Sequence, residues 1–334
     1  MDSRNGDDQD HAAAIGDIEA AAKRLAGQLV HTPLLESEFL NEQYGGRILI
    51  KPECLQRTGS FKFRGAYNRI SQFTQEERKR GIVAFSSGNH AQGVASSARI
   101  FGIKAVIIMP SDAPRAKIAN TRAYGAEVVF FDRYTQSREA VAAPFVEERG
   151  MVLVPPFDDP AIIAGQGTVG LELVAQAEER GLVLDDVFVP TGGGGLVSGV
   201  SVAVKARSPR TRIWGVEPDN FDDLRRSLAA GKIVRNETGH RSICDAILTP
   251  QPGELTFAIN RRNLSGGIAV SDAAVRQAMR AAADRLKLVV EPGGCVALAA
   301  LASGQVDIRG RTVAVVLSGG NVDLETYGAL IAAA

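Results

Sequence analysis

The chain lacks the features that would assign it to several specialised classes of protein. It has no excess charge, because 38 lysines and arginines balance 38 aspartates and glutamates, so no net field would recruit nucleic acid or an anionic membrane. It has only three cysteines and no Cys-x-x-Cys pair, which argues against a disulfide framework and is typical of a reducing compartment. No apolar run reaches the roughly 18 to 20 residues needed to span a bilayer. We therefore expect a cytoplasmic protein that acts on a small molecule, without a nucleic-acid or membrane partner.

What the chain does have is enough length and apolar content for a large core. Its 334 residues, of which 45% are hydrophobic, predict a globular protein of about two domains. Its first residues are polar and acidic, whereas a secretory signal begins basic and then turns apolar. We therefore expect residues 1–14 to form a disordered leader rather than a targeting signal.

From Gly81 onward, short apolar segments alternate with helical patterns and glycine-containing turns. The segments Ile82–Phe85 and Ala105–Met109 have the length of buried strands, and Ala91–Phe101 between them has the pattern of a helix. Such alternation predicts the α/β class, with open, parallel-type sheets that helices cover on both faces.

The same alternation divides the chain into two predicted domains. Residues 81–157 are predicted to form a small mobile domain, inserted into a large domain built from residues 15–80 and 158–334. In the large domain we expect a helix over Thr168–Arg180 and irregular structure over Arg241–Asn260.

One lysine stands in an unusual position. The stretch Thr58–Ala66 has the pattern of a turn entering a helix, with Ser60 as the N-cap. Residues three and four apart form one buried stripe, which comprises Phe63, Ala66, Tyr67 and Ile70. Lys62 lies off this stripe in the first turn, where the helix dipole favours the neutral, nucleophilic amine. A solvated surface residue is the commoner role of a lone lysine, but two glycines and an aromatic ring on each side favour a chemical role here.

A four-glycine turn follows a predicted strand and opens a helix within Thr191–Gly199. Its glycines leave a run of backbone N–H groups unobstructed at the helix N-terminus, which is a site for an anion such as phosphate. Two alternatives stay open. One is a simple tight turn, and the other is a dinucleotide site in which Glu217, at the end of the next strand, binds a ribose. The dinucleotide pattern is imperfect, because Val197 or Ser198 stands where the third glycine is expected.

Three other turns follow predicted strands and carry polar side chains. Ser86–His90 lies between a strand and a helix. Ser318–Asn321 follows the strand Thr312–Leu317, at the end where ligands of open α/β sheets gather. Glu217–Asp223 is acidic, and it is either a solvated loop or a site for a hard cation, which prefers carboxylate and carbonyl oxygens.

The segment Lys51–Ala66 carries a resemblance to a known family. Its residues Lys-Pro-Glu and Gln-Arg-Thr-Gly-Ser-Phe-Lys-Phe-Arg-Gly-Ala resemble the cofactor-lysine segment of the pyridoxal-phosphate enzymes with the tryptophan synthase β-subunit fold, called fold type II. Within that fold, the segment is similar to the branch of threonine/serine dehydratases and serine racemases. The resemblance runs from about Thr32 to Asp323, and the other motifs agree with it in order.

The resemblance implies the two-domain architecture of fold type II, with pyridoxal 5'-phosphate bound by the large domain. The implied cofactor-binding residues are Lys62, joined covalently to the aldehyde, Phe61 on a face of the ring, Asn89 at the 3-oxygen, Gly192, Gly193, Gly194, Gly195 and Leu196 at the phosphate, and Ser318 at the pyridine nitrogen. A hydroxyl at that nitrogen cannot stabilise a pyridinium as a carboxylate would, which favours β-elimination over transamination.

The resemblance also implies residues that contact the substrate. Ser87 would lie on the ring face opposite Lys62, where its hydroxyl could exchange the α-proton of the substrate. The other implied contacts are Ser86 and His90 in the loop that binds the substrate carboxylate, and Tyr124 and Arg138, which close over the substrate. Ser242 and Glu291 lie in segments that line the site. A site for Mg or Ca is implied at Glu217, the carbonyl oxygen of Phe221, and Asp223.

The resemblance implies a threonine/serine dehydratase of amino-acid catabolism, an ammonia-lyase that eliminates water from a β-hydroxy amino acid and releases a 2-keto acid and ammonia. A homodimer is the usual assembly of such enzymes. Ser87 and the acidic loop leave serine racemase and 3-hydroxyaspartate dehydratase open as alternatives, and a dehydratase of hydroxyectoine utilisation is a further one. From a different class, an NAD-binding protein that uses Gly192–Gly199 and Glu217 also stays open.

Overall fold

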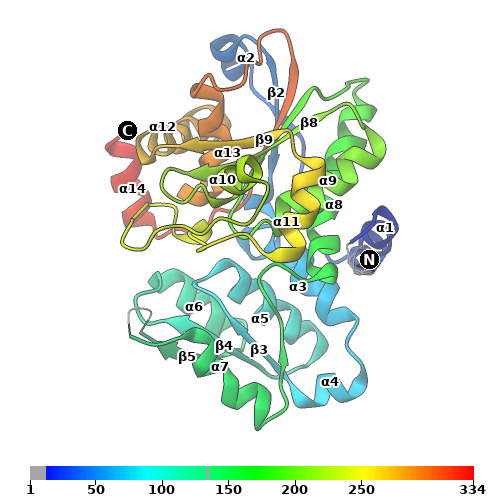
Figure 1. Cartoon of the computed structure of the whole chain (residues 1–334), viewed down its shortest axis with the longest axis vertical. Coiled ribbons are helices and arrows are strands. Elements are labelled where there is room, and N and C mark those ends of the chain that lie inside the picture. The colour runs from blue at the N-terminus through cyan, green and yellow to red at the C-terminus, as the bar shows by residue number, and fades with distance from the viewer. Residues whose placement is uncertain (1–12, 133–134) are drawn as a thin grey trace, which may run out of the picture.

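The structure, a computed structural model, describes residues 13–132 and 135–334 and contains two sheets that lie in separate halves of the molecule (Figure 1). The leader predicted over residues 1–14 lies outside the described residues apart from Ala13 and Ala14. No helix among the described residues is long and apolar enough to cross a membrane.

The larger sheet has six strands in the order β1-β2-β10-β7-β8-β9. Its neighbouring strands run parallel, except that β1 pairs antiparallel with β2. The strands are β1 (Leu35–Glu36), β2 (Arg47–Pro52), β7 (Asp186–Pro190), β8 (Arg212–Pro218), β9 (Gly266–Val270) and β10 (Thr312–Leu317).

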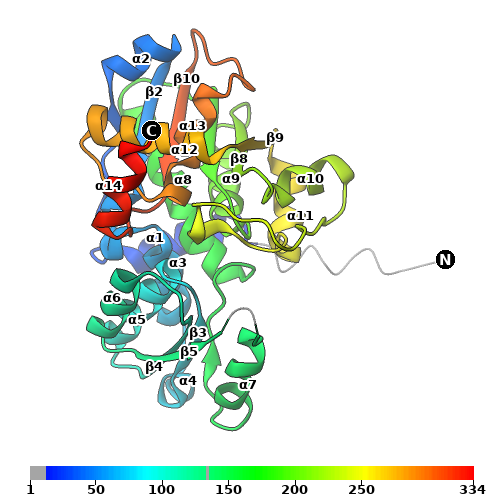
Figure 2. The same ribbon diagram turned by 90° about the vertical axis from the view of Figure 1, so that its left-hand side faces the viewer.

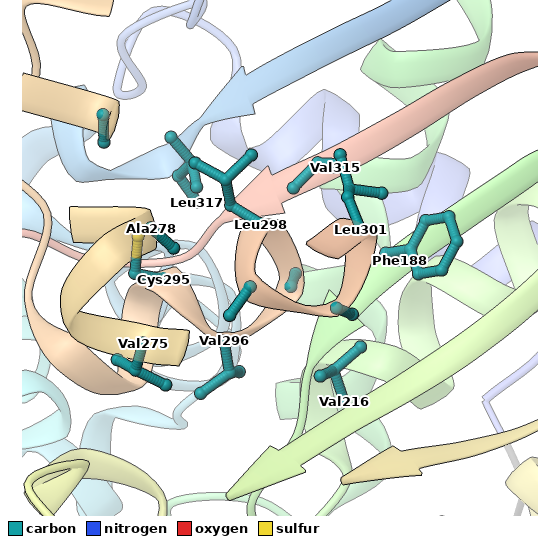
Figure 3. Close-up of a cluster of buried hydrophobic side chains, with 14 of the residues drawn as sticks. Phe188, Val216, Val275, Ala278, Cys295, Val296, Leu298, Leu301, Val315 and Leu317 are labelled. Carbon is teal, nitrogen blue, oxygen red and sulfur yellow. The ribbon is translucent and has the colours of Figure 1, made fainter. Parts of the chain in front are cut away.

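Helices cover both faces of this sheet. The helices of the large half are α1 (Ile15–Leu25), α2 (Glu38–Tyr44), α3 (Lys62–Ser71), α8 (Pro160–Glu179), α9 (Gly195–Arg207), α10 (Asp223–Ala230), α11 (Glu254–Asn263), α12 (Asp272–Ala281), α13 (Pro292–Ala302) and α14 (Leu324–Ala332). Side chains of β10 alternate between the two faces, as a pleated strand requires. Val313 and Val315 pack against α12 and α13, whereas Ala314 and Val316 pack against α8 and α9. Figure 3 shows the first of these cores, in which Leu301 of α13 lies beside Val315 and Phe188, and Leu298 lies beside Leu317.

The smaller sheet has four parallel strands in the order β5-β4-β3-β6. Its strands are β3 (Ile82–Phe85), β4 (Ala105–Pro110), β5 (Glu127–Phe131) and β6 (Val152–Leu153), and its helices are α5 (Asn89–Phe101), α6 (Arg115–Ala123) and α7 (Arg138–Glu147). Residues of α5 pack on one face of β3 and β4, and residues of α7 pack on the other face. The predicted α/β class with parallel sheets covered on both sides is therefore confirmed.

The four strands of the smaller sheet all fall within the predicted small domain, residues 81–157. Helix α4 (Gln75–Arg80), which we assigned to the large domain, lies with the smaller sheet in both views of the chain (Figures 1 and 2). The limits of the two domains stay a prediction.

The predicted N-cap of the lysine helix is wrong. Helix α3 begins at Lys62, so the residue at its N-cap position is Phe61. Thr58 and Gly59 have positive φ values of 65° and 72°, which turn the chain so that Ser60 is extended and forms an antiparallel bridge with Gly319. The side chain of Ser60 therefore does not cap the helix.

Helix α8 begins eight residues before the predicted start at Thr168, because Asp159 caps it and Pro160 occupies its first position. Its glycines look like turn residues in the sequence, but they allow close packing. A Cβ at Gly165 would lie 2.6 Å from the carbonyl oxygen of Arg64, and one at Gly167 would lie 2.9 Å from that of Gly199. The segment Arg241–Asn260, predicted to be irregular, contains the first residues of α11 and a short turn of 3₁₀ helix over Asp245–Ile247.

Candidate active site

A pocket of about 950 Å³, its open mouth included, lies where the two halves meet at the carboxyl ends of their strands. The large half contributes Phe61, Lys62, the four glycines that follow β7, Leu196 and Ser318. The small half contributes Ser86, Ser87, Asn89, His90 and Arg138. The structure therefore brings together in one pocket residues of four separate sequence motifs, together with Arg138.

Lys62 projects into this pocket from the first turn of α3. Its Nζ donates a hydrogen bond to the carbonyl oxygen of Pro156 at 2.6 Å and lies 5.3 Å from the centroid of the Phe61 ring. Burial lowers the pKa of the Lys62 amine to about 8. The direction agrees with the prediction from sequence, although burial rather than the helix dipole is the cause. The amine therefore gives up its proton more readily at neutral pH than an ordinary lysine does.

The four-glycine turn forms a tight wall of the pocket. A Cβ at Gly193 would lie 2.4 Å from the ring of Phe157, and one at Gly192 would lie 3.1 Å from the Cα of Ile247. Gly194 has φ 94°, a conformation that side chains disfavour. The turn opens α9, and the first N–H groups of a helix have no partners within the helix. Side chains would be crowded at this turn, and the N–H groups of its glycines suit a phosphate.

Asn89 belongs to a polar network that crosses between the two halves. Its Nδ2 donates a short hydrogen bond to Oε1 of Glu291, and its Oδ1 accepts one from Nδ2 of Asn321 at 2.9 Å. Oε2 of Glu291 pairs with Nζ of Lys117 at 3.0 Å, and the same Nζ pairs with Oδ2 of Asp245 at 2.9 Å.

Sequence reasoning placed Glu291 only in a segment near the site and missed Lys117 and Asp245. No local pattern could have identified the pairing, because Lys117 is separated by 174 residues from Glu291 and by 128 from Asp245.

Ser318 lies at the end of β10, on the floor of the pocket. Its carbonyl oxygen accepts a hydrogen bond from the N–H of Phe61 at 3.1 Å, which ties the floor to the residue before Lys62. The lining residue at this strand end is therefore one whose side chain carries a hydroxyl rather than a carboxylate.

Among the described residues, the small half presents neutral polar groups and the cation Arg138 to the pocket. Nε2 of His90 lies 2.9 Å from the carbonyl oxygen of Val154, and burial lowers the pKa of His90 to about 3, so the ring is neutral. Its Nδ1 is buried without a partner in the described part of the chain. The guanidinium of Arg138 lies 4.6 Å from the centroid of the Phe85 ring and pairs with Glu139 at 2.8 Å. Arg138 is thus a cation that the small half brings to the pocket.

Tyr124, which the resemblance assigned to the substrate side, and Ser242, which it placed in a segment that lines the site, both lie elsewhere. Tyr124 follows α6 and packs beside α5, where it lines a separate hollow with Ala95 and Arg99. Ser242 donates a hydrogen bond to Oδ1 of Asp272 at 2.6 Å and does not line the pocket. The substrate contact implied for Tyr124 and the position implied for Ser242 stay predictions that this arrangement does not support.

The acidic loop buries two carboxylates together. Both oxygens of Glu217 accept backbone N–H groups, from Leu224 and Arg225, at 2.8 Å. Burial and the neighbouring Asp223 raise the pKa of Glu217 well above its ordinary value, and burial raises the pKa of Asp223 to about 7. Oδ2 of Asp223 is buried without a hydrogen-bond partner among the described residues.

These features fit a hard cation at the acidic pair, with the carbonyl oxygen of Phe221 as the further ligand that the sequence proposed. In residues 13–132 and 135–334, no group of three or more His, Cys, Asp and Glu side chains could hold a metal ion, so the predicted site depends on two carboxylates and backbone oxygen. Glu217 does not line the pocket with the four glycines, which disfavours the dinucleotide alternative.

The pocket fits pyridoxal phosphate by the chemistry of its donor set. It holds a lysine amine with a lowered pKa, a glycine cradle at a helix N-terminus for the phosphate, and a serine hydroxyl at a strand end. The buried, unpartnered Nδ1 of His90 and the amide of Asn89 supply further polar groups.

Comparisons with known proteins cover almost the whole chain. The family described as pyridoxal-phosphate dependent enzyme matches residues 26–319. An L-threo-3-hydroxyaspartate ammonia-lyase of Pseudomonas sp is 47% identical over 315 residues, which are 94% of this chain and 97% of that protein. Among solved structures, a threonine deaminase of T.th. is 47% identical with a TM-score of 0.88 and covers 93% of this chain and 99% of its own. Maize serine racemase is 38% identical with a TM-score of 0.90, and the match covers 96% of this chain and 97% of the racemase chain.

Proposed function

This chain belongs to the pyridoxal-phosphate dependent enzymes, and from that premise we propose that it is an ammonia-lyase that eliminates water from a β-hydroxy amino acid. The products are a 2-keto acid and ammonia. The observation that carries the proposal is the placement of Lys62, with its lowered pKa, in one pocket with the glycine cradle and Ser318. When bound, pyridoxal phosphate supplies the electron sink that stabilises negative charge at the α-carbon of the substrate.

The residues of the chain have distinct tasks in this proposal. The N–H groups of Gly192–Gly195 hold the phosphate, and Phe61 and Asn89 orient the ring. Nζ of Lys62 takes the proton from the α-carbon, a task for which a pKa of about 8 is well matched at neutral pH. The hydroxyl of Ser318 leaves the ring nitrogen without a strong proton donor, which favours elimination over transamination.

For the substrate, we propose a β-hydroxy amino acid with a second carboxylate, that is, a 3-hydroxyaspartate. The hydroxyls of Ser86 and Ser87 and the neutral His90 can bind the α-carboxylate, which leaves the guanidinium of Arg138 for the other carboxylate. The similarity to an L-threo-3-hydroxyaspartate ammonia-lyase supports this choice.

Threonine or serine, our first choice from the sequence, is the second candidate. The rings of Phe85 and Phe157 line the same pocket and suit the methyl group of threonine. The similarity to a threonine deaminase supports it as well.

The two candidates are separated by one substitution. We expect Arg138→Met to raise the KM for a 3-hydroxyaspartate by roughly 10- to 100-fold, because a hydrogen-bonded charge is lost. Turnover of L-threonine should change less than about twofold, since surface changes away from the contact have small effects. Glu139→Gln, which removes the partner of Arg138 and keeps the guanidinium, is the matched control. An equal loss on both substrates would contradict the dicarboxylate proposal.

The proposal as a whole is tested at Lys62. Lys62→Ala should abolish both keto-acid release and the visible absorbance of bound cofactor, because the covalent attachment is lost. A variant that kept full elimination activity would contradict the role of this amine.

We propose racemisation as a second activity, since Ser87 lines the same pocket as Lys62 and the chain is similar to a serine racemase. Ser87→Ala should suppress racemisation and leave the elimination of L-substrates. Loss of both activities to the same extent would remove the special role of Ser87.

We also propose a bound Mg or Ca ion at Glu217, Phe221 and Asp223, a homodimeric assembly and a cytoplasmic location. The buried, unpartnered oxygen of Asp223 supports the cation. The family resemblance supports the homodimer, and the low cysteine content supports the cytoplasmic location. Light scattering of the purified protein measures the assembly directly.

A further inference from the structure

Lys117 is a buried cation at the junction of the two halves, and the proposed mechanism does not use it. It lies on α6 of the small half, and its side chain is 2% exposed. Both of its acidic partners, Glu291 and Asp245, belong to the large half. The same end of α6 makes a second contact with the large half, because the N–H of Ala116 donates to Oδ1 of Asp323 at 3.1 Å.

The stem of Lys117 reaches its partners through a space that a glycine leaves open. A Cβ at Gly88, in the middle of the Ser86–His90 loop, would lie 2.1 Å from Cδ of Lys117. The φ of Gly88, 168°, lies outside the left-handed range, so it does not by itself demand glycine. The glycine of this loop is therefore required by the lysine stem that passes over it.

The two acidic partners of Lys117 are connected to different parts of the pocket lining. Glu291 accepts the hydrogen bond from Nδ2 of Asn89, so its position fixes the amide of a residue that lines the pocket. Asp245 begins the segment Asp245–Thr249, all five residues of which line the pocket. One ammonium group therefore holds two pieces of the site that come from separate segments of the chain.

Stability alone does not account for this arrangement. Replacing a buried ion pair by apolar residues is often neutral or stabilising, because desolvation of the two charges offsets their attraction. A set of charge-assisted hydrogen bonds does, however, fix geometry in a way that apolar packing does not.

We propose that Lys117 is a positioning residue, which fixes the Asn89 amide through Glu291 and holds the Asp245–Thr249 wall in place over the bound substrate. The proposal rests on the proposed function, since it is the proposed reaction that needs this geometry. Lys117 itself touches neither the substrate nor the cofactor.

The test compares Lys117→Met with Lys51→Met in the holoenzyme. Lys51 is a matched control, because it too is fully buried and pairs with an acid, Glu172, at 2.7 Å, but it does not line the pocket. Both substitutions should lower the unfolding temperature. Only Lys117→Met should shift the visible absorption of the bound cofactor and speed amide hydrogen exchange in residues 245–249. Its kcat should fall roughly 100-fold, the loss expected for a displacement of about 1 Å at a site.

Asp245→Asn separates the effect of Lys117 on the Asp245–Thr249 wall from its effect on Asn89 through Glu291. This variant also provides the test if Lys117→Met does not fold. This variant keeps the pair between Lys117 and Glu291, so exchange in residues 245–249 should rise while the cofactor absorption stays unchanged.

If Lys117→Met and Lys51→Met give the same absorption and the same exchange as the wild type, or if Asp245→Asn leaves exchange in residues 245–249 unchanged, the proposal is wrong. Failure of the wild type to release keto acid from any β-hydroxy amino acid would instead contradict the proposed function, because absorption and exchange are measured without substrate.

Discussion

Glu291 and Glu217 are both fully buried glutamates of the large half, but they face opposite kinds of neighbour. Glu291 faces the ammonium of Lys117, which comes from the small half. Glu217 faces another carboxylate, Asp223, six residues further along the same half. Burial raises the pKa of both glutamates; Lys117 opposes that rise at Glu291, whereas Asp223 adds to it at Glu217.

The difference shows two ways of compensating a buried negative charge. An unpaired charge in an apolar interior is costly, so it must be neutralised by a counter-charge or by a proton. At Glu291 the counter-charge is part of the chain and crosses the junction of the two halves, so the ion pair depends on how the halves sit together. At Glu217 the described part of the chain offers no cation to the carboxylate, so protons or a diffusible cation must neutralise it.

The largest loss of stability and activity is expected when the ion pair between Lys117 and Glu291 is broken. Glu291→Gln leaves Lys117 as a buried cation with only Asp245, which is 37% exposed, beside it. Removing one partner of a buried ion pair costs about 3–5 kcal/mol. We therefore expect the unfolding temperature of the holoenzyme to fall sharply and keto-acid release to be lost. Asp245→Asn, which removes the more exposed acid, should cost much less. Equal effects of the two substitutions would mean that burial does not distinguish these partners.

The acidic pair should make stability depend on pH in the absence of a cation. The pKa of Asp223 is about 7 in the folded protein against an ordinary value of 3.8, so the folded state holds a proton that the unfolded state has lost between these pH values. Stability should therefore fall as the pH rises through this window, by an amount of the order of 4 kcal/mol.

Mg²⁺ or Ca²⁺ should reverse this loss, because it binds the deprotonated pair. The increase in unfolding temperature on adding the cation to chelator-treated protein should be larger at pH 8 than at pH 5. An increase that is independent of pH, or none at either pH, would contradict the cation site.

A smaller effect, of opposite sign to that of Glu291→Gln, is expected for Asp223→Asn. The amide removes the like charge beside Glu217 and places a donor where the unpartnered oxygen lies. In chelator at pH 8 the variant should be more stable than the wild type, by up to the roughly 4 kcal/mol that the ionisation of the buried Asp223 costs the folded state in this window. It should also lose the response to Mg²⁺ and Ca²⁺. Asp219→Asn, at an exposed position in the same loop, is the control and should change neither property.

The same two glutamates mark what the sequence could predict. The acidic loop after a strand left a hard-cation site and a solvated loop open, and the family resemblance selected Glu217 and Asp223 within it. The glycine turn and Lys62 were indicated by local turn–helix patterns that the structure retains, whereas the role of Ser318 was implied by the resemblance. The lowered pKa of Lys62 was predicted in direction but not in cause, because burial is a property of the assembled pocket.

The Lys117 network could not be predicted, because its partners come from distant parts of the chain and its residues follow no spacing rule. The N-cap of α3 and the start of α8 were missed for a related reason. Ser60 is held by a bridge to Gly319, and the glycines of α8 are required by neighbouring backbone, so both depend on contacts with other segments.

The smallest effect concerns the far end of the helix that carries Lys117. Tyr124 immediately follows α6, but it packs beside α5 and lines a hollow apart from the pocket, although the resemblance implied that it closes over the substrate. If α6 serves the site only through Lys117, Tyr124→Phe should change kcat/KM by less than about twofold and stability by less than about 0.5 kcal/mol. A tenfold loss of kcat/KM with unchanged stability would mean that α6 moves onto the substrate during turnover. The ion pair between Lys117 and Glu291 would then form in only one of two arrangements of the halves. The two buried glutamates would differ more strongly, because Glu217 and Asp223 lie in one loop and stay together in both arrangements.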